Sequence, residues 1–347
     1  MTPLITLICP IHMKTFRCVR HGTTRSIMNN FPLFFIHIPK TAGSSFRVTA
    51  EQYFGSEATY FDYGKGSKET HPDILKFEYE SKDRYLAAKS IKKNAKFLSG
   101  HVIYPKYAPF FPAKSVVTFV RDPAQQVRSH YEHFSRLHGY KGSFEDFIKE
   151  NRFANMQSKA LNGIWADAIG FIGITERYNE SIALFNKYYG TDIKVLDINK
   201  NTAKASGIYT FTESETSLIQ KMNEKDYELY DYALNRFDLH KEILDKELPL
   251  VRFGEMNILP KDKGKQLNIW ACCYEQEEAL EADILLDGKA VEHIKLSDYR
   301  ALASERNIHR EGYIGKSYKY PATFKNGQTI KVVEKQTQIV IFEDVVS

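Results

Sequence analysis

The sequence predicts an α/β fold, in which a parallel sheet carries helices on both faces, followed by a small β-rich, sandwich-like domain. Two observations lead to this fold class. Between residues 33 and 248, short apolar runs of strand length alternate with longer segments of helical periodicity, which is the pattern of a parallel sheet with crossover helices. From residue 264 onward, short runs of strand character are separated by Asp-Gly, Asn-Gly and Pro turns, which indicates a β-rich module.

Length and composition set the domain organisation. The chain has 347 residues, of which 43% are hydrophobic and 26% charged, enough for one large domain and a smaller one. We expect an N-terminal arm of uncertain structure over residues 1–30, the α/β domain over 31–260 and the β-rich domain over 264–347. The net charge of +5 is too mild to point to nucleic acid, but it suits an anionic nucleotide and an acidic glycan.

The apolar stretches and cysteines bear on the cellular compartment. The apolar patch near the N-terminus is broken by Pro10 and His12, is too short to span a membrane and lacks the charged start of a signal peptide. The four cysteines have no metal-ligand spacing and are too few for a disulfide scaffold. We therefore expect a cytoplasmic protein without a metal site, and attachment to a membrane surface stays open.

The first strand, LFFIHI at residues 33–38, leads through a P-loop-like turn into a helix expected over Ser44–Phe54. Pro39 ends the strand, because proline cannot donate to a sheet ladder. Gly43 allows close backbone approach, and the free N–H groups at the helix start face the loop together with two hydroxyls. The loop predicts a phosphate or sulfate site formed by Lys40, Thr41, Ala42, Gly43, Ser44 and Ser45.

The elements that follow continue the alternation, after a long loop expected over 55–73. Strands are expected over residues 96–99, 115–120, 168–174 and 193–196, and helices over 83–93, 123–137, 144–150, 176–189 and 212–248. Thr212 and Glu215 have the spacing of a capping box at the start of the last helix. Ligands of open parallel sheets bind beyond the carboxyl ends of the strands, which is where His101 is expected.

The loop at 33–46 and the segment VVTFVRDPAQQVRSHYEHF at 116–134 resemble the two cofactor-binding segments of the sulfotransferases, specifically the branch of heparan and chondroitin sulfate O-sulfotransferases. The resemblance spans about residues 33–250. It implies transfer of a sulfuryl group from 3′-phosphoadenosine 5′-phosphosulfate (PAPS), without a metal, to a hydroxyl of a carbohydrate such as a polysaccharide, glycolipid or surface glycan. Animal relatives carry a membrane anchor, so its absence favours a bacterial enzyme.

The resemblance also implies roles for individual residues. Lys40 would bind the 5′-phosphosulfate and assist departure of the leaving group, while Arg121 and Ser129 would bind the 3′-phosphate. Gln126 stands where the family pattern RDPxxR has its second arginine. The run NMQSKALNG at 155–163 resembles the family's Asn-x-Gln-x-Arg run, with Lys159 in place of the arginine.

His101 is the expected catalytic base, since histidine has an unperturbed pKa suited to taking a hydroxyl proton near neutrality. The 2-O-sulfotransferases have a similar Gly-His after a strand, with that histidine as the base. A carboxylate, Glu51 or Glu57, is the rival. His37 is expected to be structural because it lies inside the strand, and His130 and His133 are expected on a helix surface.

Other features leave alternatives open. Lys89, Lys92, Lys93 and Lys96 form either a solvated helix face or an acidic-acceptor groove, and Trp165 either packs or stacks on a sugar. A kinase or hydrolase acting on ATP would place its loop lysine after the last glycine, follow it with Ser or Thr for magnesium and need a separate acidic residue, whereas here Lys40 precedes Gly43. A non-catalytic glycan-binding protein, in which the β-rich module does the binding, is the other alternative. The oligomeric state is not predicted.

Overall fold

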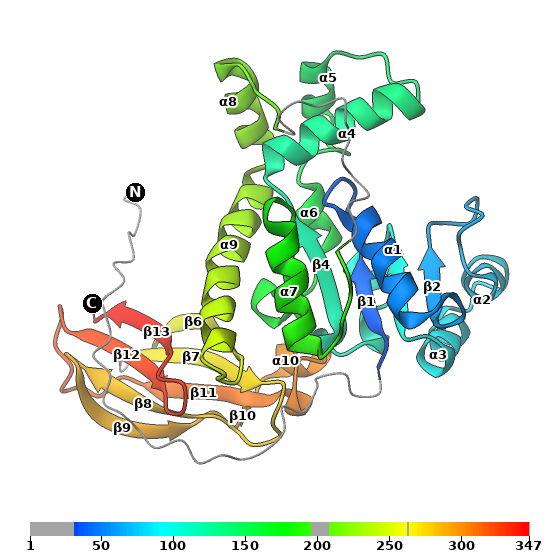
Figure 1. Ribbon diagram of the computed structural model, residues 1–347. Coiled ribbons are helices and arrows are strands. Elements are labelled where there is room, and N and C mark those ends of the chain that lie inside the picture. The colour runs from blue at the N-terminus through cyan, green and yellow to red at the C-terminus, as the bar shows by residue number, and fades with distance from the viewer. Residues whose placement is uncertain (1–30, 196–207, 262–263, 347) are drawn as a thin grey trace.

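The computed structural model describes residues 31–195, 208–261 and 264–346, so the expected N-terminal arm lies outside the described residues (Figure 1). Within this part of the chain, a five-stranded sheet has the order β2-β3-β1-β4-β5, and every neighbouring pair is parallel. The strands are β1 (Leu33–Ile36), β2 (Thr59–Asp62), β3 (Phe97–Gly100), β4 (Val116–Val120) and β5 (Phe171–Ile174). Their carboxyl ends form the upper edge of the sheet in Figure 1, and the predicted fold class is confirmed.

One predicted strand is wrong. Residues 193–195 form no strand, and residue 196 lies outside the described residues. The side chain of Asn186 accepts from the N–H of Ile193 (3.0 Å) and donates to its carbonyl (2.9 Å), so this backbone is satisfied without a neighbouring strand. The edge strand is instead β2, within the stretch expected to be a long loop.

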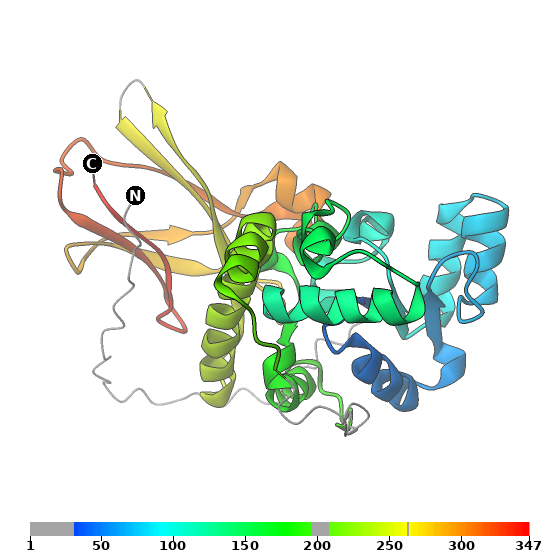
Figure 2. The same ribbon diagram turned by 90° about the horizontal axis from the view of Figure 1, so that it is seen from above.

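Helices cover both faces of the sheet. The helices of this part of the chain are α1 (Gly43–Phe54), α2 (Pro72–Ile74), α3 (Arg84–Asn94), α4 (Pro123–Leu137), α5 (Phe144–Lys149), α6 (Met156–Ala160), α7 (Tyr178–Tyr189), α8 (Glu213–Met222) and α9 (Glu224–Asp245), of which α4, α5 and α8 lie above the sheet rather than on a face. The predicted capping box of Thr212 and Glu215 is present, but the helix predicted over 212–248 divides at the buried Asn223 into α8 and α9. Figure 2, seen from above, shows α4 lying across the upper edge of the sheet.

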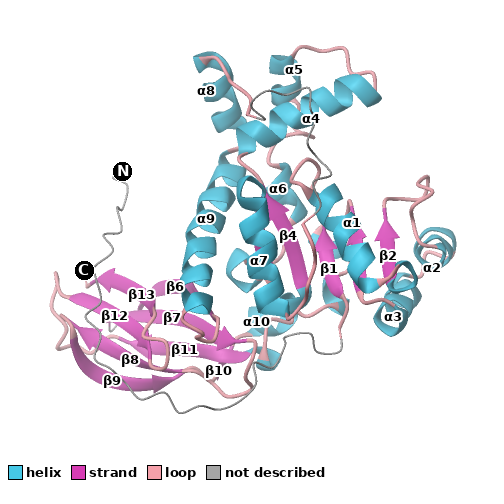
Figure 3. Cartoon of the chain, viewed as in Figure 1, coloured by secondary structure: helices cyan, strands magenta, loops and turns pink. Residues whose placement is uncertain are grey.

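The C-terminal part consists of two antiparallel sheets, with the orders β10-β11-β7-β6 and β13-β12-β8-β9, shown in magenta in Figure 3. The elements are β6 (Val251–Lys261), β7 (Gly264–Cys273), β8 (Glu281–Leu286), β9 (Lys289–Lys295), β10 (Asp298–Tyr299), α10 (Ala301–Glu305), β11 (Tyr313–Lys319), β12 (Thr329–Glu334) and β13 (Val340–Val345). Buried residues of both sheets, such as Ile269 and Ile284, share one apolar core. Because β6 pairs with β7, the β-rich part begins at Val251, and the boundary expected between 260 and 264 falls inside a hairpin.

The two parts pack tightly at the amino-end edge of the parallel sheet. Trp165 stacks on the buried Trp270 of β7, with ring centroids 5.5 Å apart, so Trp165 is a packing residue rather than a sugar platform. Arg252 donates to the carbonyl of Gly170 (2.6 Å), and Tyr274 donates to that of Ala168 (2.6 Å). The β-rich part is therefore hydrogen-bonded to the backbone just before β5, at the end of the parallel sheet opposite the upper edge.

Candidate functional site at the carboxyl edge of the sheet

The loop between β1 and α1 has an unusual backbone. Lys40 and Ala42 both have positive φ angles, 69° and 62°, and the hydroxyl of buried Thr41 donates to the carbonyl of Ile38 (2.9 Å). Ala42 caps α1 without a side-chain hydrogen bond, and the first turn of α1 carries no acidic residue. The positive end of the helix dipole is therefore directed at the upper edge without an anionic side chain of its own first turn.

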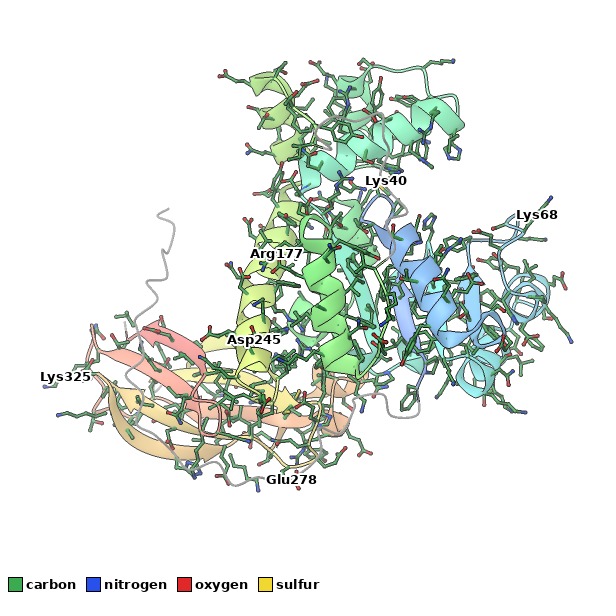
Figure 4. All side chains as sticks on the ribbon, in the orientation of Figure 1. Lys40, Lys68, Arg177, Asp245, Glu278 and Lys325 are labelled. Atoms are coloured by element: carbon green, nitrogen blue, oxygen red, sulfur yellow. The ribbon has the colours of Figure 1, made fainter. Side chains whose placement is uncertain are left out.

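The side chains of this loop face different surroundings. Figure 4 labels Lys40 at the upper edge, where α1 begins below α4. Ser44 is exposed, whereas Ser45 is buried. A Cβ atom on Gly43 would lie only 2.1 Å from Cδ2 of His37, so glycine is required here by an imidazole ring of the protein itself.

The second sequence segment holds the loop from above. Arg121 donates through Nη1 to the carbonyl of Lys40 (3.2 Å), and the fully buried Gln126 donates through Nε2 to the carbonyl of Pro39 (2.9 Å). Since C=O and N–H point in opposite directions across a trans peptide, the N–H groups of Lys40 and Thr41 point away from these two side chains. Nothing in the residue pattern around Gln126 indicates this contact.

Gln157 in turn fixes Arg121. Its fully buried amide accepts from the backbone N–H of Arg121 (2.9 Å) and donates to its carbonyl (2.9 Å). The carboxylate of Asp226 on α9 accepts from the N–H groups of Gln157 (3.1 Å) and Ser158 (2.7 Å) at the start of α6. This is the structural role of the run at 155–163, while Lys159 is exposed and donates to the carbonyl of Asn151 (2.6 Å).

Ser129 lies on α4, half-buried, and its hydroxyl makes no hydrogen bond with the described part of the chain. Arg121 is also paired with Glu176, with Nε and Oε1 3.8 Å apart. Arg128 pairs with Glu132 (3.7 Å) and stacks over Phe144 (4.7 Å from the ring centroid). Arg128 therefore faces the α5 side rather than the loop and does not replace the arginine missing at position 126.

His101 follows β3 directly and is exposed at the upper edge. Its ring packs edge-on against the rings of His37 (4.5 Å between centroids) and Tyr63 (4.8 Å). Partial desolvation, followed by the positive charge of Arg47 and the neighbouring His133, lowers the pKa of His101 to about 4. The imidazole is therefore neutral at neutral pH, which is the state that a general base requires.

The rival carboxylates lie at the wrong end of α1. Glu51 is eight residues beyond Gly43, which is about 12 Å along the helix axis at about 1.5 Å per residue. Glu57 lies further still, just before β2 begins at the amino-end edge. The lysine cluster also lies toward the amino-end edge, since Lys92 and Lys93 end α3 and Lys96 precedes β3.

His130 is not on the helix surface. It is buried on α4 among the rings of Phe134, Phe147 and Phe153, with ring centroids 4.7, 5.6 and 5.3 Å away. Burial, more than neighbouring charge, lowers the pKa of His130 to about 4. His133, one turn further, is half-exposed, as a residue on a helix surface would be.

Three further features concern only the part of the chain that the structure describes. A pocket of about 430 Å³ lies between α6 and α9, with Leu161, Ile169 and Tyr232 in its wall, and contains none of the predicted site residues. No cluster of three or more His, Cys, Asp or Glu side chains is arranged to hold a metal in this part of the chain. No described helix is long and apolar enough to cross a membrane.

No protein-family model matches this chain, and no curated protein matches it. Among solved structures, mouse sulfotransferase SULT7A1 complexed with PAP superimposes with a TM-score of 0.37 at 14% identity, over 59% of this chain and 90% of that chain. A sulfotransferase from Alicyclobacillus acidocaldarius superimposes with a TM-score of 0.34 at 14% identity, over 59% of this chain and 96% of that chain.

Proposed function

We propose that this protein is a PAPS-dependent sulfotransferase that transfers a sulfuryl group to a hydroxyl of a carbohydrate. The observation that carries the proposal is the meeting of the two segments singled out in the sequence. Arg121 donates a hydrogen bond to the carbonyl of Lys40, 81 residues away in the chain, and Gln126 donates one to the carbonyl of Pro39, 87 residues away. Both bonds lie at the carboxyl edge of the sheet, where parallel sheets bind ligands.

The residues at this edge suit PAPS, which offers only acceptor oxygens at its 5′-phosphosulfate and 3′-phosphate. Lys40, the start of α1 and the exposed hydroxyl of Ser44 supply positive charge and donors for the phosphosulfate. Thr41, Ala42, Gly43 and Ser45 shape the loop around them. Arg121 retains Nη2, which has no hydrogen bond within the described chain, and with the Ser129 hydroxyl it would hold the 3′-phosphate.

When bound, PAPS supplies the sulfuryl group and a leaving group, 3′-phosphoadenosine 5′-phosphate (PAP). His101 takes the proton of the acceptor hydroxyl while the acceptor oxygen forms its bond to sulfur and the bond from sulfur to the bridging phosphate oxygen breaks. Lys40 stabilises the negative charge that develops on that bridging oxygen, an interaction that strengthens toward the transition state. Neither residue requires a metal for these roles.

The carbohydrate acceptor, and the place in the heparan and chondroitin branch, are proposed from the sequence resemblance. The open position of His101, with the positive charge of Arg47 acting on it, supports an acceptor that is large and carries acidic groups.

Calorimetry tests this function directly. PAP should bind the purified protein at micromolar concentration or below, and Lys40→Ala should weaken that binding. ATP with magnesium serves as the matched ligand: stronger binding of ATP than of PAP would overturn the proposal in favour of a kinase or hydrolase. Transfer of label from labelled PAPS to one member of a glycan panel would identify the acceptor, and labelling of none would favour a binding protein.

A further inference from the structure

His37 occupies the position between the proposed phosphosulfate loop and the proposed base. It follows β1 directly, its N–H donates to the carbonyl of Gly100 (3.0 Å), and its side chain is only 6% exposed. One edge of its ring contacts Gly43, the first residue of α1, and the ring meets that of His101 in an edge-to-face arrangement, with centroids 4.5 Å apart. A purely structural residue in the strand, as the sequence suggested, would not be expected to touch both.

The Nδ1 atom of His37 has a defined partner. It lies 2.8 Å from the hydroxyl of Tyr63, which is 3.4 Å from the hydroxyl of Ser99. Arg47 lies over the ring of Tyr63, 5.3 Å from its centroid. Burial raises the pKa of Tyr63 above its ordinary value, so the phenol keeps its proton and can donate it to Nδ1.

With the Tyr63 phenol as the donor, this bond leaves the ring hydrogen of His37 on Nε2. Burial, followed by the charges of His101, Arg47 and Lys40, lowers the pKa of His37 well below its ordinary value, so the ring is neutral at neutral pH. A neutral imidazole that accepts at Nδ1 has its hydrogen on Nε2. Nε2 and Cδ2 are the ring atoms nearest to the Cβ position of Gly43, at 2.5 and 2.1 Å, so the N–H is directed at the start of α1.

We propose that His37 is a second functional imidazole of the site, whose Nε2–H donates a hydrogen bond to the sulfuryl group held in the loop. Tyr63 is a positioning residue that fixes the tautomer. The inference rests on the proposed function and adds a residue to it. His37 exchanges no proton in the step: the acceptor oxygen bonds to sulfur, its proton goes to His101, and PAP leaves with the electron pair of the broken S–O bond.

The two neighbouring histidines thus have different tasks because their surroundings differ. His101 is exposed and can meet an acceptor, whereas His37 is buried and meets the donor through the loop. A neutral donor suits this place, since the loop already brings Lys40 and the positive end of α1 to the same anion. Its contribution grows as negative charge spreads over the departing group.

Two substitutions of similar polarity separate the nitrogens of His37. Glutamine places its amide near the position of Nε2, and asparagine places its amide near that of Nδ1. In single-turnover assays with PAPS, His37→Asn should lower the rate by about a hundredfold, the usual effect of removing one such donor. His37→Gln should stay within about tenfold of wild type. PAP, which lacks the sulfuryl group, should bind both variants within about threefold of wild type.

Equal rates for His37→Asn and wild type would overturn the inference, as would a loss of PAP affinity in His37→Asn that matches its loss of rate. Should both His37 variants fail to fold, the Tyr63→Phe variant and the tautomer of His37 decide whether the inference holds. Nitrogen NMR of the wild-type protein should show the ring hydrogen of His37 on Nε2. A ring hydrogen on Nδ1 would contradict the inference. A wild-type protein that neither binds PAP nor uses PAPS would instead overturn the proposed function itself.

Discussion

At the residue scale, the exposed His101 differs from the other histidines of the site, since His37 and His130 are enclosed. Its low pKa comes from partial desolvation and from Arg47 and His133, which together outweigh the opposite effect of the Glu69 carboxylate. This combination leaves a free base at the surface over the whole physiological pH range.

His101→Ala should therefore bind PAP as wild type does but turn over about a hundredfold to ten-thousandfold more slowly. Because the pKa of His101 is lowered to about 4, the wild-type single-turnover rate should stay level as the pH falls through 6.5 and decline only near pH 4 to 5. That decline should vanish in the residual activity of the variant. A variant within about fivefold of wild type would remove His101 from the role, and His138→Ala, at an exposed position after α4, serves as the control.

Substitution of Ser129 and of Arg121 should change ligand affinity in different ways, although the resemblance implies that both residues bind the 3′-phosphate. Ser129→Ala should weaken PAP binding about tenfold to a hundredfold, the value of a hydrogen bond to a charged group. The affinity of Ser129→Ala for the analogue without the 3′-phosphate should equal that of the wild type. Arg121→Ala should weaken both ligands, because Arg121 also bonds the carbonyl of Lys40. Calorimetry with the two ligands checks this, and equal weakening of both by Ser129→Ala would contradict the assignment.

At the element scale, the β1–α1 loop keeps its shape through contacts from α4 and the turn before it, in addition to the Thr41 hydrogen bond within the loop. Two consecutive carbonyls are held by Arg121 and Gln126, and Gln157 holds Arg121 in its turn. The loop geometry is thus a property of three elements packed together, which explains why positive φ angles are tolerated at Lys40 and Ala42.

Gln126→Met tests this packing. Methionine fills a similar volume without donating, so the buried carbonyl of Pro39 would lose its partner at a cost of about 1–3 kcal/mol in the free energy of unfolding. PAP affinity should fall as well, because the loop would no longer be fixed in the binding conformation. Denaturant unfolding and calorimetry measure the two effects. Gln220→Met, at an exposed site on α8, should change neither, and a Gln126→Met protein equal to wild type in both would refute the role.

The elements with strong local signals could be predicted from the sequence, and the failures have physical causes. The strand at 33–36 and the helices α1 and α4 carry apolar runs, prolines and turns that act locally. The edge strand β2 was missed because it is short and lies among loop-forming residues. Gln157 and Gln126 could not be assigned contacts, since those contacts join segments 36 and 87 residues apart.

At the scale of the whole molecule, the β-rich part is joined to the α/β part by a buried junction rather than by a linker. The stacked Trp165 and Trp270 lie there, with Arg252 and Tyr274 bonded to backbone carbonyls before β5. The sequence pattern suggested an accessory module. Turn residues indicate where strands begin and end, but they do not indicate which other part of the chain the strands pack against.

Deletion of the chain from Gly264 onward should therefore prevent folding. It would leave β6 without its partner β7, uncover Trp165 and remove the bond from Tyr274 to Ala168. Circular dichroism should show loss of cooperative unfolding, and PAP binding should be lost with it. A truncated protein that unfolds cooperatively and binds PAP with full affinity would show that the α/β part is independent. Trp270→Ala, expected to cost about 3–5 kcal/mol, is the milder version of the same test.

The position of that junction also determines how the molecule can be tethered. Lys325 in the β-rich part and Lys40 in the loop lie toward opposite ends of the molecule (Figure 4), and the chain ends beyond β13 on the β-rich side (Figure 1). A copy immobilised by its C-terminus, on a bead or a sensor chip, would hold the loop outward into solution. A long polymer could then reach His101 from the side without passing the support.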